Sequence, residues 1–144
     1  MATREQIYSA LFALGQGLTW GAPSTTWAFS MRRAILDQLS PEQQPAFLQT
    51  EFSEESAQVR GQDPLRKFHV GWFIMLYDGN PDAIMATQAN QILDAIDALF
   101  PPDPMVQTLG GLVYSVKING AIDRFGGSID SQMLLVVPLT IIAP

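Results

Sequence analysis

The segment KFHVGWFIMLYDG (67–79) constrains the fold more than any other part of the chain, because its centre is apolar on both sides. Read as a strand, it places Phe68, Val70, Trp72, Ile74 and Leu76 on one face. The other face carries His69, Phe73, Met75 and Tyr77. A strand with two apolar sides is typical of the interior of a sheet. The sequence therefore predicts a strand with neighbours on both edges.

The preceding segment supplies the first neighbour. AFLQTEFSEESA (46–57) sets Phe47, Gln49 and Glu51 against Leu48, Thr50 and Phe52, an alternation that predicts a half-buried strand. The residues QVRGQDPLR (58–66) between the two strands are turn-forming. The sequence thus predicts a pair of adjacent antiparallel strands.

Two later segments complete the predicted sheet. In QTLGGLVYSVKINGAI (107–122), Leu112, Tyr114, Val116 and Ile118 share one side of a third long strand, and Gly110–Gly111 provide a bend at its start. The polar segment 123–131 reads as a long hairpin loop, in which Gly126–Gly127 permit positive φ. The hydrophobic segment 132–142 is the fourth strand.

Two helices are predicted. Ile7, Leu11, Leu14 and Leu18 form one apolar face over residues 3–18, and Thr3 with Gln6 forms a capping box. The second helix covers residues 80–102. It starts at Asn80, Pro81 and Asp82, its buried stripe runs from Ala89 to Phe100, and Pro101–Pro102 end it. Alternating Trp27, Phe29 and Met31 indicate an additional short strand, and residues 34–45 form a loop or a helical turn.

These elements predict one α+β domain over residues 1–144. Its mainly antiparallel sheet of about four strands packs with two helices in the order α-β-β-α-β-β, because adjacent strands are joined by short polar links. With 47% hydrophobic and only 15% charged residues, the surface is sparsely charged. Either part of that surface is covered in the working state, or the chain is an apolar monomer.

Composition also limits the chemistry that the chain can perform. It contains no cysteine, which excludes thiolate metal sites, disulfides and a Cys nucleophile, and its net charge of −6 lacks the basic footprint of a nucleic-acid binder. The start MATREQIYSALFALG has no signal-peptide pattern, and the apolar run 133–143 is too short to cross a bilayer. We expect a protein of a cytoplasm-like space, or of a particle assembled there.

We find no catalytic or ligand-binding motif. His69, the single histidine, lies within a strand pattern and is expected to be structural. DGNPDA (78–83) begins like a calcium loop but has Ala83 and Ala89 where that loop requires Gly and Glu. FGGS (125–128) lacks the pattern of a phosphate-binding loop. We therefore expect no enzyme activity, no catalytic residue, no metal and no cofactor.

Several segments taken together resemble a known family. QPAFLQTE (44–51), NQILDAIDALF (90–100), QTLGGLVYSVKINGAI (107–122) and VVPLTIIAP (136–144) are similar, in order and spacing, to tail terminator or tail completion proteins of long-tailed bacteriophages. The resemblance spans residues 44–144, and MRR (31–33) is a looser match. It implies an α+β fold without catalytic residues or cofactor.

The resemblance also implies a function. Tail terminators form a ring, typically of six copies, on the head-proximal end of the tail tube, where they stop polymerisation and provide the docking surface for the head. The implied partners are other copies of the chain, the tail tube protein and a head–tail connector or neck protein, with DNA only passing through the ring and no membrane. The implied location is the virion, after assembly in the host cytoplasm. An acidic or neutral bore is expected, so that DNA does not stick.

A subunit of such a ring needs exposed contact elements, and sheet edges and long hairpin loops are suited to this. We expect subunit or tube contacts in 59–67 and 123–131, although both could be plain solvent loops. The candidate residues are Val59, Arg60, Gln62, Asp63, Arg66, Lys67, Asp123, Arg124, Phe125, Gly126, Gly127, Ser128 and Asp130.

Two other interpretations remain. One is a different neck protein, such as a head–tail connector or stopper. The other is a small ligand-binding or hydrolytic domain, which would require an apolar cleft with convergent polar groups near His69, Glu51 or Asp94.

Overall fold

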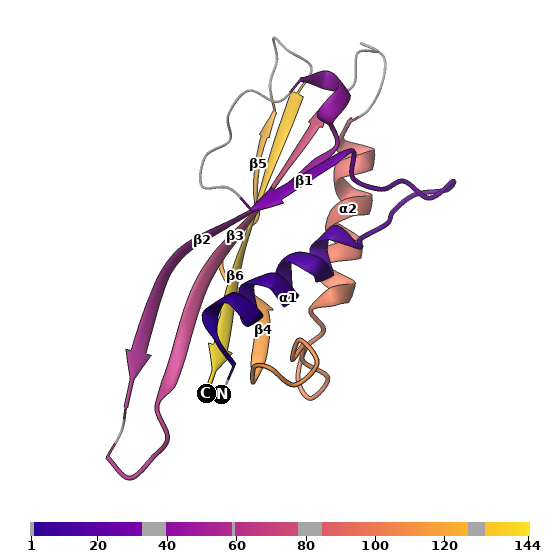
Figure 1. Cartoon of the computed structure of the whole chain (residues 1–144). Helices are drawn as coiled ribbons and strands as arrows, with labels where there is room; N and C mark the ends of the chain where they lie inside the picture. The colour runs from indigo at the N-terminus through magenta and orange to yellow at the C-terminus, as the bar shows by residue number, and fades with distance from the viewer. Residues whose placement is uncertain (1, 33–39, 59, 78–84, 127–131) are drawn as a thin grey trace.

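A computed structural model of the chain describes residues 2–32, 40–58, 60–77, 85–126 and 132–144. Within these ranges the fold is α+β, with two helices and one mixed sheet of six strands. Both helices lie on the same side of the sheet (Figure 1). The elements are α1 (Arg4–Gln16), β1 (Phe29–Arg32), a 3₁₀ turn (Pro41–Gln43), β2 (Ala46–Ala57), β3 (Leu65–Tyr77), α2 (Met85–Leu99), β4 (Ser115–Ile118), β5 (Asp123–Gly126) and β6 (Gln132–Ala143).

The strand order is β1-β2-β3-β6-β4, and β5 also pairs with β6. The β1–β2 pair is parallel and all other pairs are antiparallel, so the predicted four-stranded antiparallel sheet is close but incomplete. β4 pairs with residues 139–142 of β6 and β5 with residues 133–136. These two short strands therefore follow one another along the same edge of β6.

The third long strand was predicted wrongly. Residues 109–114 form turns and bends, Gln107 makes only an isolated bridge to Val116, and only Ser115–Ile118 pair as β4. Leu109, Gly110 and Gly111 all have positive φ (51°, 71° and 92°), a left-handed conformation that cannot continue a strand. Leu109 and Val113 of this loop are buried in the core and Leu112 packs partly against it, whereas Tyr114 is exposed.

The loop predicted over 123–131 is also partly wrong. Asp123–Gly126 form strand β5, because their backbone pairs with Val136–Met133 of β6. Residues 127–131, with Gly127, Ser128 and Asp130, lie outside the described residues, as do the predicted helix start at 80–82, the calcium-like segment 78–83, and residues 33–39.

The hydrophobic core lies between the helices and the sheet. Trp72 of β3 occupies its centre, where its ring packs edge-on against Phe47 (5.0 Å between centroids) and tilted against Phe100 (5.3 Å). Its indole Nε1 donates a hydrogen bond to Gln49 Oε1 (3.0 Å), and Gln49 Nε2 donates to the Tyr8 carbonyl (3.0 Å). Gln49 is fully buried, and both ends of its amide are satisfied.

Helix α1 forms as predicted. Thr3 Oγ1 accepts from the Gln6 amide and Gln6 Oε1 accepts from the Thr3 amide, which completes the capping box. Ile7 and Leu11 are fully buried against the sheet. The helix approaches β2 closely at Gly15, because the ring of Phe47 occupies the space where a Cβ would lie.

We therefore expect Gly15→Ala to lower the free energy of unfolding by up to about 2 kcal/mol. Overpacking costs about 1–3 kcal/mol, and alanine recovers about 1 kcal/mol of helix propensity. Gly17→Ala is the matched control, since the nearest atoms to its added Cβ are carbonyl oxygens at 3.6 and 3.9 Å. Urea unfolding of both variants checks this. Equal stabilities would contradict the close packing of α1 on Phe47.

Candidate interaction surface

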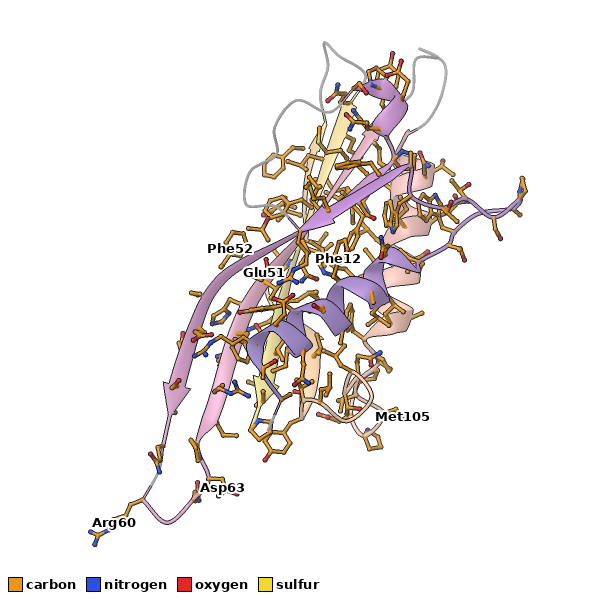
Figure 2. All side chains as sticks on the ribbon, in the orientation of Figure 1. Phe12, Glu51, Phe52, Arg60, Asp63 and Met105 are labelled. Atoms are coloured by element: carbon orange, nitrogen blue, oxygen red, sulfur yellow. The ribbon has the colours of Figure 1, made fainter. Side chains whose placement is uncertain are left out.

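The hairpin β2–β3 projects beyond the body of the molecule (Figure 1). Ala46–Thr50 are buried, whereas every described residue from Phe52 to Leu65 is exposed. The first part of β2 is therefore buried on both faces, and the rest is exposed. The alternation had instead predicted one buried and one exposed face along the whole strand. We call residues 54–66 the arm. Arg60 and Asp63 lie at its tip, farthest from the helices (Figure 2).

Contacts to both ends of the chain fix the root of the arm. Arg4 makes an ion pair with Glu54 (2.6 Å). Arg66 donates from Nε to the Pro144 carbonyl and from Nη2 to the Ala2 carbonyl, both at 2.8 Å. Arg66 was predicted as a contact residue, but the structure directs it inward. The direction of the arm is thus set by the body, while its tip has no support.

A second ionic group joins α1 to the sheet where β2 leaves the body. Arg32 of β1 lies between Glu5 and Glu51, with an ion pair of 2.6 Å to each. Hydrogen bonds from Arg32 and Ser9 lower the pKa of Glu5, and a hydrogen bond from Arg4 lowers the pKa of Glu54. Glu54 directly, and Glu51 through Arg32, therefore link α1 to the sheet (Figure 2 labels Glu51).

These pKa shifts predict how stability depends on pH. A carboxyl group whose folded pKa lies below its unfolded value stabilises the folded state above the unfolded pKa, near 4.5. That stability is lost as the pH falls through the folded pKa. We expect the free energy of unfolding to decrease as the pH falls below about 4.5, and to do so less steeply in Arg32→Gln.

Denaturant unfolding at a series of pH values, at low salt, measures this dependence. Glu42→Gln is the matched control, because that glutamate makes none of the ion pairs found in the described residues. If Arg32→Gln kept the full acid dependence of the natural protein, the ionic group would not be its source.

The sheet face opposite the helices, which we call the open face, is largely apolar. It carries the odd-numbered residues of β1, β3, β4 and β5 and the even-numbered residues of β6, as the strand register requires. No described helix lies over it (Figure 1). Four of the six large apolar side chains that are exposed among the described residues lie on this face: Met31, Phe52, Leu65 and Phe125.

The upper part of the open face, around Phe52, Phe73 and Phe125, is built from aromatic rings. Phe52 is 60% exposed and packs edge-on against Phe73 (6.0 Å between centroids). It covers Gly71, where a Cβ would clash with both rings. Phe125 of β5 is 57% exposed. Large contiguous apolar patches on a protein surface often mark an interface, and these two exposed rings are the candidates for such a patch here.

The lower part of the open face, around Lys67 and strand β4, is polar and contains a depression. A depression of about 260 Å³ is lined by Lys67, Ser115, Lys117, Ile118, Asn119, Thr140 and Ile142. Asn119 Nδ2 donates to Thr140 Oγ1 (3.2 Å), and Lys117 makes an ion pair with Asp103 (2.9 Å). Lys67 makes no ion pair with any described residue.

The structure separates the predicted contact residues into three groups. Arg60, Gln62 and Asp63 lie at the arm tip, Lys67 and Phe125 lie on the open face, and Arg124 turns to the helix side, where it donates to Asn90 (2.7 Å). Asp123 shares the open face with Phe125, and Gly126 ends β5. Val59 lies outside the described residues. Sequence reasoning missed Met31 and Phe52.

The residues considered for hydrolytic chemistry do not converge. His69 lies on the open face, where its Nε2 is 3.4 Å from Glu55 Oε1. Glu51 faces α1 on the other side of the sheet, and Asp94 is exposed on α2. The sheet itself separates His69 from both carboxylates. In the described ranges, no group of three or more metal-ligating side chains is present.

Comparison with known proteins does not assign the chain to a family. No family model matches the chain, and no curated protein matches its sequence. Among the described residues, no helix combines the length and apolarity needed to cross a membrane.

Proposed function

We propose that the protein is a structural subunit of a ring that caps the head-proximal end of the tail tube in a long-tailed bacteriophage. In this role it ends tube polymerisation and presents a docking surface to the head or neck. The ring has about six copies, and it acts in the virion without catalysis or cofactor. The segments that resemble tail terminators motivate this assignment.

The observation that carries the proposal is the open face. The two helices cover only one of the two apolar faces of the sheet. On the other face Ala46 and Leu48 are buried, but Met31, Phe52, Leu65 and Phe125 remain exposed. The tip of the projecting arm is a second element without support, since only its root contacts the body and an isolated two-stranded hairpin is marginally stable in water. The arm tip and the open face are different surfaces of one chain. Contacts between different surfaces are heterologous, and such contacts form a ring when the rotation between neighbouring subunits closes.

Tube assembly tests the proposal. The purified protein is added to tail tube protein, from the genome that encodes this chain, as the tubes polymerise. We expect negative-stain images to show added density at one end only, and tubes that stop growing. Density bound instead to isolated heads or connectors would favour the neck-protein alternative. Tubes that grow unchanged, with no bound density at either end, would contradict the proposal.

A further inference from the structure

We propose that the depression on the lower open face is a receptor for a carboxylate, and that its occupant is Asp63 at the arm tip of a second copy of this chain. This inference rests on the proposed function, because it needs copies of the chain to meet. It adds the residues that join one subunit to the next.

The side chains that line the depression include several hydrogen-bond donors, so they favour a ligand with hydrogen-bond acceptors. Lys67 lies opposite Glu55 in the strand register, but its ammonium group makes no ion pair with the described residues. Thr140 Oγ1 already accepts from Asn119, so its own hydroxyl proton is free to donate. The Ser115 hydroxyl is a further donor. A carboxylate has only acceptors, and charge-assisted hydrogen bonds to it are stronger than neutral ones.

The arm tip offers such a group. Asp63 is exposed at the end of the arm, and it makes no ion pair with the described residues (Figure 2). The root of the arm is fixed by Arg4 and Arg66, so the tip is presented in a defined direction. Within the described residues, the tip itself has no contact with the body, so binding must also order the residues around Asp63, at a cost in conformational entropy that the ionic contact has to exceed.

Asp63 does not reach the depression of its own chain. Asp63 lies before the start of β3 at Leu65, and in its own chain it makes no ion pair with Lys67 or Lys117. The occupant is therefore another molecule. Each copy carries one arm and one depression, so a closed ring of identical subunits satisfies both with none left over.

Cross-linking tests the contact directly, because the natural chain has no cysteine. The double variant Gln62→Cys/Ser115→Cys leaves Asp63 and both lysines intact, and is treated with a short bismaleimide. We expect a ladder of covalent oligomers that ends at the ring size. The matched control, Gln62→Cys/Ala98→Cys, moves the second thiol to the exposed face of α2 and is expected to give only background.

Charge reversal provides the second measurement. Asp63→Lys is expected to weaken association about fivefold or more, and adding Lys67→Asp is expected to restore it. A ladder no stronger than the control, in a protein that still forms rings, would overturn this inference alone. A protein that neither self-associates nor binds tubes would overturn the proposed function as well.

Discussion

Replacing Trp72 by alanine is expected to lower the free energy of unfolding by about 4 kcal/mol, a large part of the stability of a domain this size. The side chain is fully buried between Phe47 and Phe100, so its removal leaves a cavity. It also removes the hydrogen bond to the buried Gln49 amide. Guanidinium unfolding, followed by far-UV circular dichroism, measures the change.

Trp72→Phe separates the two contributions. The phenyl ring keeps most of the packing but cannot donate to Gln49, so we expect a smaller loss, about 1–3 kcal/mol. If Trp72→Ala cost less than 1 kcal/mol, the core would not be organised around this residue.

Replacing Phe125 by aspartate is expected to raise the concentration needed for self-association about thirtyfold. A buried aromatic residue at an interface contributes about 2 kcal/mol or more, and a charge at that position also has to be desolvated. The stability of the monomer should change little, because the ring is 57% exposed in the single chain. Sedimentation velocity over a range of concentrations measures the effect.

Met105→Asp is the matched control for this variant. Met105 is 75% exposed but lies in the segment after α2, away from the open face (Figure 2). We expect its self-association to equal that of the natural protein. Equal effects of the two substitutions would mean that general surface hydrophobicity, rather than the open face, drives association.

The sequence predicted the elements whose signals are local. Helix α1 was found from its apolar spacing and from the Thr3–Gln6 capping box, and both are present. The two-sided apolar pattern of 67–79 correctly predicted a strand with neighbours on both edges, β2 and β6. Such patterns are read within a few residues and need no knowledge of tertiary packing.

The errors arose where tertiary context decides. Leu112 and Tyr114 alternate as in a strand, but three successive positive φ angles, at residues 109–111, place them in a loop. The alternation of 46–57 predicted a strand but could not show that its second half projects from the body, because an alternating pattern does not indicate where along a strand the core ends. Only the fold reveals that Phe52 is exposed and that Arg66 and Arg124 bind within their own chain.

The sequence predicted only one part of the candidate interaction surface, the arm tip. Turn residues in 58–66 marked a hairpin tip, and Arg60, Gln62 and Asp63 do lie between β2 and β3. The open face was missed because both sides of β3 read as core. No sequence pattern indicates that the two helices cover the same side of a sheet.

The mass of the purified protein in solution, measured by light scattering across a range of concentrations, tests the central claim most directly. The account predicts a closed species of about six chains of 15.8 kDa, seen as rings in negative stain. A chain that assembles only on its target would show this species once tail tubes are added. A mass that stays at one chain at high concentration, and in the presence of tubes, would contradict it.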